Sequence, residues 1–167
     1  DRASPSAAET DITQRVTNGE PYDVKDVDVS ADGLRVAFAM RGPLADGMDE
    51  DEGPTWNIWE YEIATDTLKR VIPSDIIAEE GQDVSPHYLP DGRIVFSSTR
   101  QRQSKAILLD EGKPQFEAQD EAGDEPAFVL HVMNADGSGI KQISFNQSHD
   151  LDATVLSNGR VLWTRWD

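Results

Sequence analysis

The chain has 167 residues, which is enough for one domain with a sizeable hydrophobic core. Its 32 Asp and Glu residues outnumber its 15 Lys and Arg residues, so the formal net charge is −17. This balance argues against binding to nucleic acid or to an anionic lipid surface, because both need clustered Lys and Arg. The sequence contains no cysteine, which excludes disulfide bonds, thiolate metal ligands and a Cys-x-x-Cys-His haem attachment site within it.

Residues 1–11 form a polar segment without the basic and then apolar order of an export signal. We therefore expect that any such signal has been removed or lies outside this sequence. No apolar run approaches the roughly 18 residues that a membrane span requires, so membrane insertion is not expected.

The next segment, 12–17, is predicted to be a short strand, because it resembles a strand-like run at 140–144. A β-hairpin is predicted at 24–38, where an alternating run and an apolar run flank Asp32 and Gly33. Asp-Gly between such runs is a strong hairpin signal, because a type I′ turn needs positive φ at both central residues.

An acidic insert follows the first hairpin at about 42–54, and two further strands are predicted at 57–63 and 68–72. The same layout then recurs along the chain. The second copy has a hairpin at 83–96, an insert at about 101–127 and strands at 128–133 and 140–144, and a third copy begins with a hairpin at 150–163.

Each copy therefore comprises four antiparallel strands, and such units in tandem are the sequence signature of a β-propeller. We predict an all-β fold, a β-propeller of four-stranded antiparallel blades, over residues 12–167. The strands amount to about three blades, whereas a closed ring needs roughly four to eight. The chain is expected to be a partial propeller or a fragment of a larger chain. Its open faces would then be covered by the remaining blades of the same polypeptide or by a protein partner.

Two sequence motifs are more specific than the repeated strand pattern. They are Tyr-Leu-Pro-Asp-Gly-Arg at 88–93 and His-Val-Met-Asn-Ala-Asp-Gly-Ser-Gly-Ile-Lys-Gln-Ile-Ser at 131–144. Both resemble the exported TolB-type β-propeller repeats. Residues 85–100, 144–152 and 158–166 show a narrower resemblance, to the propeller (middle) domain of the hydrazine synthase alpha-subunit group.

The resemblance implies a periplasmic or extracellular location and association with c-type cytochromes. A related copper-dependent thiocyanate dehydrogenase uses His residues around its propeller channel. Because this chain lacks a haem attachment motif, no cofactor is expected in the chain itself. Copper or c-type haem is expected only in regions outside this chain or in its partners.

Three residues are candidate metal ligands: His149 at the joint before the third hairpin, Asp150 beside it, and His87 in the first strand of the second unit. Imidazoles together with a carboxylate suit copper or zinc. The alternative is that His149 and Asp150 hydrogen-bond the turn and that His87 packs within its strand. His131, on a strand away from the channel, is predicted to be structural.

Both inserts join a second strand to a third strand, so we expect them on one face of the propeller, together with the joints between units. Loops on a rigid scaffold commonly carry function. The carboxylates of 46–52 could bind Ca²⁺, but they lack the residue order of a calcium loop, which favours a solvated loop. The less polar run 105–116 is expected to pack on the blade or on a partner.

These features predict a binding and scaffold module, within a larger periplasmic redox assembly that contains a cytochrome. One alternative is a part of an oxidoreductase similar to hydrazine synthase alpha or to the copper-dependent thiocyanate dehydrogenase, with its site at the propeller channel. Another is a TolB-like adaptor that binds envelope proteins. No complete catalytic set is recognisable, so the sequence leaves open whether the protein is an enzyme.

Overall fold

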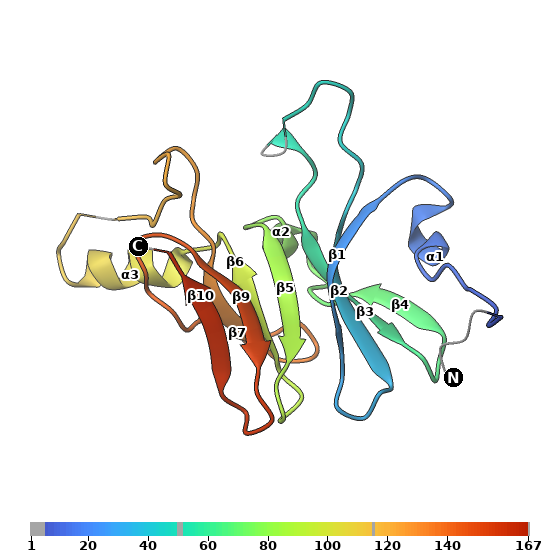
Figure 1. Ribbon diagram of the computed structural model, residues 1–167. Helices are drawn as coiled ribbons and strands as arrows, with labels where there is room; N and C mark the ends of the chain where they lie inside the picture. The colour runs from blue at the N-terminus through green and yellow to red at the C-terminus, as the bar shows by residue number, and fades with distance from the viewer. Residues whose placement is uncertain (1–5, 50–51, 115, 167) are drawn as a thin grey trace.

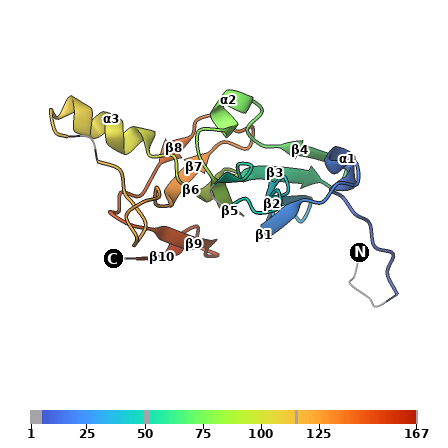
Figure 2. The same cartoon turned by 90° about the horizontal axis from the view of Figure 1, so that it is seen from above.

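Three antiparallel sheets contain the strands of the computed structural model, which describes residues 6–49, 52–114 and 116–166 (Figure 1). Blade 1 has the strand order β1-β2-β3-β4, blade 2 has β5-β6-β7-β8, and blade 3 is the hairpin of β9 and β10. The strands are β1 (Asp23–Val29), β2 (Arg35–Arg41), β3 (Asn57–Glu62), β4 (Thr67–Arg70), β5 (Asp83–Tyr88), β6 (Ile94–Ser98), β7 (Val129–Met133), β8 (Lys141–Gln142), β9 (Asp150–Val155) and β10 (Val161–Arg165). This pattern confirms the predicted all-β architecture of four-stranded antiparallel units. Within the described ranges the sheets form an open arc and not a closed ring (Figure 2).

The three predicted hairpins are present, but their turns are not of the predicted type I′. Only the glycine of each Asp-Gly or Asn-Gly pair has positive φ: +70° at Gly33, +85° at Gly92 and +78° at Gly159. The residue before each glycine uses a side-chain oxygen to accept the N–H group two residues onward, at 3.0–3.1 Å. These hydrogen bonds stabilise a longer hairpin loop in which one left-handed glycine is sufficient.

A β-bulge recurs at the same place in the first strand of every blade. The bulge residues Asp26, Ser85 and Asp152 have positive φ of 57°, 51° and 50°. At each bulge, two residues of the first strand face a single aromatic residue of the second strand, which is Phe38, Phe96 or Trp163. Because a bulge bends its strand and redirects the side chains, the three first strands share one shape that sequence alternation did not predict.

Blade 1 packs against blade 2 through a hydrophobic core to which both sheets contribute. Its buried residues are Ala37, Ile58, Val71, Ile72, Ala78, Tyr88, Ile94, Phe96 and Met133. Hydrogen bonds also cross this interface: Asp26 accepts the Ser85 N–H at 3.0 Å, and Asp28 accepts the Tyr88 N–H at 2.9 Å. These bonds join β1 to β5, and β5 in turn contacts β9, so the first strands lie along one side of the arc (Figure 2).

The strand predicted at 12–17 is wrong, because this segment contains the short helix α1 (Gln14–Thr17), which ends at a left-handed Asn18. Ile12 and Val16 pack on a cluster of blade 1 that includes Phe38, Met40 and Leu68. A spacing of four residues places two side chains on one side of a helix and also on one side of a strand. The apolar pattern therefore could not distinguish the two conformations, and packing against blade 1 decides between them.

Long connections leave the second strand of each complete blade. The connection in blade 2 contains α3 (Arg102–Asp110), a helix that the sequence did not predict. A further helix, α2 (Asp75–Ala78), begins at the N-cap Ser74 and lies between blade 1 and blade 2. Figure 1 shows α2 and the loops of both connections at the end opposite the three hairpin turns, and we call this end the insert face. Across the described ranges, no helix is long and apolar enough to span a membrane.

Candidate binding site on the insert face

A cavity of about 860 Å³ opens on the insert face and has walls from all three blades. Equivalent positions of successive blades line it, as the strand registers show. Three of these positions lie at or just after the end of the second strand: Arg41, Thr99 and Trp166. The residues just before the third strand are Trp56 and Phe128, and those just before the first strand are Gln82 and His149. A repeated set of positions therefore builds one site, which we call the insert-face pocket.

Two cations lie on Trp56 at one end of this pocket. The Lys25 ammonium is 4.4 Å from the centroid of the Trp56 ring, and the Arg41 guanidinium is 4.7 Å from it. Arg41 also donates from Nε to Asp23 at 3.1 Å. The backbone N–H of Trp56 donates to Gln82 Oε1 of blade 2 at 2.8 Å, which ties the main chain at Trp56 to the next blade. Cation–π contacts of this kind stabilise both cations beside an apolar surface.

His149 lies at the opposite end of the pocket between two aromatic rings. Its ring centroid is 6.0 Å from those of Phe128 and Trp166. The Phe128 N–H donates to His149 Nδ1 at 3.1 Å, so the proton of the neutral imidazole is on Nε2. That Nε2 atom is 3.9 Å from a carboxylate oxygen of Glu121. The sequence predicted the place of His149 at a joint between units, but not its aromatic neighbours.

Carboxylates of the second connection form an acidic rim beside His149, and they are Asp120, Glu121, Asp124 and Glu125. Asp120 organises this loop by accepting the N–H groups of Gly123 and Asp124 at 2.8 and 3.2 Å. Burial opposes the charged form of Asp120, yet these backbone donors outweigh it and lower the pKa of the carboxyl group. The pocket thus has two cations at its Trp56 end, where Asp23 pairs with Arg41 and Glu79 lines the wall, and a group of carboxylates at its His149 end.

The three predicted metal ligands have different surroundings. Asp150 is fully buried and accepts hydrogen bonds from Trp163 Nε1 at 3.0 Å and from Arg165 Nε at 2.9 Å. His87 lies in β5, with Nδ1 3.4 Å from an Asp28 oxygen. In the part of the chain that the structure describes, no group of three or more His, Asp or Glu side chains is arranged to hold a metal ion. The metal site at His149, His87 and Asp150 stays a prediction.

A buried aspartate at the start of the first strand pairs with an arginine in blade 2 and again in blade 3, and the sequence did not predict these pairs. Arg100 of blade 2 is almost fully buried, whereas Arg165 of blade 3 is 45% exposed. Asp83 has no exposed surface and accepts from Arg100 Nε at 3.1 Å, as Asp150 does from Arg165. Burial raises the pKa of Asp83 to about 6, against the opposing effect of the Arg100 charge. The available signal was an aspartate at one position of two repeats with an arginine near the end of each second strand. These pairs fix the strand ends beside the insert-face pocket.

Four-stranded antiparallel blades with adjacent first strands define this chain as an open arc of a β-propeller. No protein-family model and no curated protein sequence matches the chain. Solved structures do match it. TolB from Acinetobacter baumannii has a TM-score of 0.54 at 15% identity, over 84% of this chain and 26% of that chain.

Hydrazine synthase from Kuenenia stuttgartiensis also has a TM-score of 0.54, at 19% identity over 84% of this chain and 21% of that chain. A TolB protein from Agrobacterium tumefaciens has a TM-score of 0.52, at 19% identity over 86% of this chain and 38% of that chain. The chain therefore has the TolB-like propeller fold, as the repeats predicted. It spans between about a fifth and two fifths of the length of these proteins.

Proposed function

We propose that the chain is a binding module of an exported protein, periplasmic or extracellular, and that it binds a protein partner through the insert-face pocket. One observation carries this proposal: equivalent positions of three blades contribute aromatic and charged side chains to the same cavity. Trp and Arg are enriched among residues that dominate binding energy, and loops on a rigid scaffold are the usual place for recognition. The TolB-like fold is consistent with such a module.

The charge distribution specifies the kind of segment that fits. Lys25 and Arg41 would pair with an acidic group of the partner, whereas Glu121 and its neighbours would pair with a basic group. The Trp56 ring lies at the Lys25 end, and the rings of Phe128 and Trp166 lie beside His149 at the other end. These rings would contact apolar side chains of the segment. We therefore expect an extended segment that carries both charges.

Charge reversal on the pocket rim tests this function. The protein and the variants Lys25→Glu and Glu121→Lys are immobilised and exposed to the exported fraction of the source cells. Recovered proteins are then quantified by mass spectrometry. Lys141→Glu on β8 is the matched control, because this exposed lysine lies outside the pocket. We expect a defined partner whose recovery falls at least about tenfold with both rim variants and is unchanged with the control. Equal recovery with all four proteins would contradict the proposal.

A redox assembly is the second candidate, and the fold likeness to a hydrazine synthase chain favours it. In this alternative, a c-type cytochrome is the partner or a copper ion is bound with ligands beyond the described residues. His149 and His87 are the imidazoles of this chain that such a site would use. Metal analysis of the full-length protein and of His149→Ala and His87→Ala tests them. Equal metal content in all three proteins would remove both histidines as ligands.

A further inference from the structure

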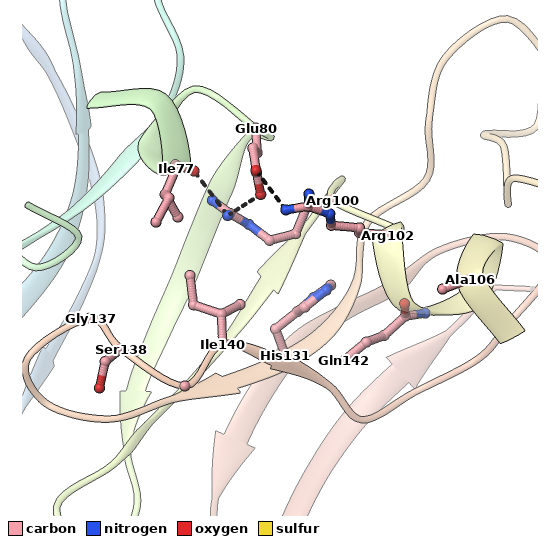
Figure 3. A pocket seen from close by; sticks show the side chains of 11 residues that line it. Ile77, Glu80, Arg100, Arg102, Ala106, His131, Gly137, Ser138, Ile140 and Gln142 are labelled. Carbon is pink, nitrogen blue, oxygen red and sulfur yellow. Dashed lines mark hydrogen bonds and ion pairs between the residues drawn. The ribbon is translucent and has the colours of Figure 1, made fainter. Parts of the chain in front are cut away.

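A second cavity, of about 600 Å³, lies between α2, which joins blade 1 to blade 2, and the outer strands of blade 2 (Figure 3). It shares no lining residue with the insert-face pocket. α2 and the residues after it form one wall, the β7–β8 turn and β8 form the other, and α3 closes one end. Gly137 permits this arrangement, because a Cβ atom there would lie 2.2 Å from the Val71 carbonyl oxygen. We call this cavity the inter-blade pocket.

Two arginines on one wall of the inter-blade pocket contact the same carboxylate. Arg102 Nη1 is 2.9 Å from Glu80 Oε1, and Arg100 Nη1 is 3.8 Å from Glu80 Oε2 (Figure 3). Glu80 therefore occupies a carboxylate-binding position between two guanidinium groups. Its side chain is 32% exposed, so it can rotate into solvent and leave this position open.

The two arginines differ in how firmly they are held. The Arg100 side chain is only 5% exposed, and its Nη1 donates to the Ile77 carbonyl oxygen at 3.0 Å, while Asp83 neutralises its charge. The Arg102 side chain is 84% exposed, and among the described residues it pairs only with Glu80. When Glu80 turns away, the pair retains one positive charge beside the cavity. An incoming carboxylate can replace the interaction that Glu80 made.

The remainder of the lining combines three apolar side chains with the polar side chains of His131, Ser138 and Gln142. Ile77 of α2, Ile140 before β8 and Ala106 of α3 border the cavity from three sides (Figure 3). A volume of about 600 Å³ is within the usual range of about 300–1,000 Å³ for small-molecule sites. An inorganic anion would use the arginines and leave this apolar space unfilled. The lining instead fits an acid with an apolar body.

We propose that the inter-blade pocket binds a small monocarboxylic acid with an apolar body, whose carboxylate replaces that of Glu80 between Arg100 and Arg102. The apolar body lies against Ile77, Ile140 and Ala106. Glu80 acts as an internal competitor that occupies the position when the ligand is absent. The residues that line this site do not line the insert-face pocket, so separate variants test the two proposals.

Calorimetric titration of the purified protein with four probes tests the ligand class. The probes are octanoate, octanol, octylammonium and acetate. We expect octanoate to bind at least about tenfold more tightly than octanol, because a hydrogen-bonded carboxylate adds to the apolar contact. Affinity should rise by about fourfold per added methylene from hexanoate to octanoate. Equal affinities for octanol and octanoate would overturn the proposed carboxylate site. Equal affinities for acetate and octanoate would overturn the proposed apolar contacts.

Variants of the pocket test its location. Arg102→Ala should weaken octanoate binding about tenfold, since a charge-assisted hydrogen bond is lost. Glu80→Gln should strengthen it about threefold, because the competing charge is removed. Ala106→Trp should abolish binding by filling the cavity. Arg93→Ala is the matched control, because Arg93 pairs with Asp91 at an exposed hairpin turn and should not affect binding.

Thermal unfolding confirms that each variant is folded before titration. The side chains of Arg102 and Glu80 are 84% and 32% exposed, so substituting either residue should leave the protein folded. These two variants therefore test the proposal even if Ala106→Trp reduces stability. Octanoate binding that is unchanged in both Arg102→Ala and Glu80→Gln would overturn the proposal, because the ligand would then bind elsewhere.

Discussion

Asp83 and Arg100 show how a buried charge pair at residue scale supports a repeated fold. Both side chains are almost completely buried, and the Ser98 hydroxyl donates to the same carboxylate at 2.6 Å. Removal of one partner from such a pair leaves the other charge buried without compensation. The pair is therefore more important for stability than the many exposed ion pairs of this acidic chain.

Asp83→Ala is predicted to lower the free energy of unfolding by about 3–5 kcal/mol, because the buried Arg100 guanidinium and Ser98 hydroxyl both lose their acceptor. Urea unfolding monitored by tryptophan fluorescence measures this change. Glu111→Ala is the matched control, since it removes the exposed Glu111–Lys113 pair and should have little effect. Equal losses in the two variants would contradict the role of burial.

His131 makes stability depend on pH. The ring is 3% exposed, and burial lowers its pKa to about 4. In the unfolded chain the pKa of histidine is about 6.5, so the unfolded state binds the extra proton first as pH falls. The contribution of neutral His131 to stability is complete above pH 6.5 and is lost as pH falls from 6.5 towards 4.

Acidification from pH 7 to pH 5 is thus predicted to cost about 2 kcal/mol through His131 alone. His131→Gln should reduce the pH dependence of the unfolding free energy by this amount, because glutamine does not titrate. NMR titration of the His131 ring gives an independent measurement, with an expected midpoint near pH 4. An identical pH dependence in the variant and the original protein would show that His131 is not responsible.

At the residue scale, the sequence predicted the positions of candidate functional residues in the repeats, but it did not predict the contacts of their side chains. The repeat pattern placed His149 at a joint between units, and it is indeed in the cavity there. The sequence predicts Asp150 as a metal ligand, and in the structure its carboxylate accepts hydrogen bonds from Trp163 and Arg165, which the sequence did not predict. Those partners depend on strand register and side-chain direction, which periodicity alone does not give.

At the scale of elements, strands were predictable and short helices were not. Alternation and turn residues marked each hairpin, because a half-buried strand has a period of two residues. α1 has four residues and α2 has four, which is too short for a helical period to emerge. α3 is longer, but Ala106 and the three apolar residues after it are contiguous and do not follow a helical stripe.

Gln101 fixes the connection that contains α3. Its buried amide donates to the carbonyl oxygens of Ala118 and Ala127, both at 2.9 Å, and accepts the Ala118 N–H at 2.7 Å. One side chain thereby provides hydrogen bonds that a neighbouring strand would otherwise supply. The connection beyond α3 is held close to blade 2 by these bonds.

Gln101→Ala is predicted to destabilise the protein by about 1–3 kcal/mol, because buried backbone groups lose their partners. Hydrogen exchange of the Ala118 amide should accelerate, while that of the β6 amides should change little. Gln147→Ala, at an exposed glutamine, serves as the control. Unchanged exchange at Ala118 would contradict this role of Gln101.

At the scale of the whole molecule, the fold was predictable because it is repetitive. The same strand pattern begins three times along the chain, which identifies the blade as the repeating unit. The Asp-Gly and Asn-Gly turns then locate the first hairpin of each blade. The pockets were not predictable in the same way, because their walls come from different blades. Trp56, Phe128 and Trp166 meet only after the blades have packed, and so do Glu80 and Arg102.

The central claim concerns the two ends of the molecule: we propose that the insert face binds a protein partner and that the end with the hairpin turns does not. Site-specific photocrosslinking in the source cells tests this claim most directly. A photoreactive phenylalanine analogue replaces Trp56 on the insert face or Leu34 at a hairpin turn, where the side chain is half-exposed. We predict a crosslink to one defined partner from position 56 and none to that partner from position 34. Crosslinks to that partner from position 34 alone, or equally from both positions, would contradict the account.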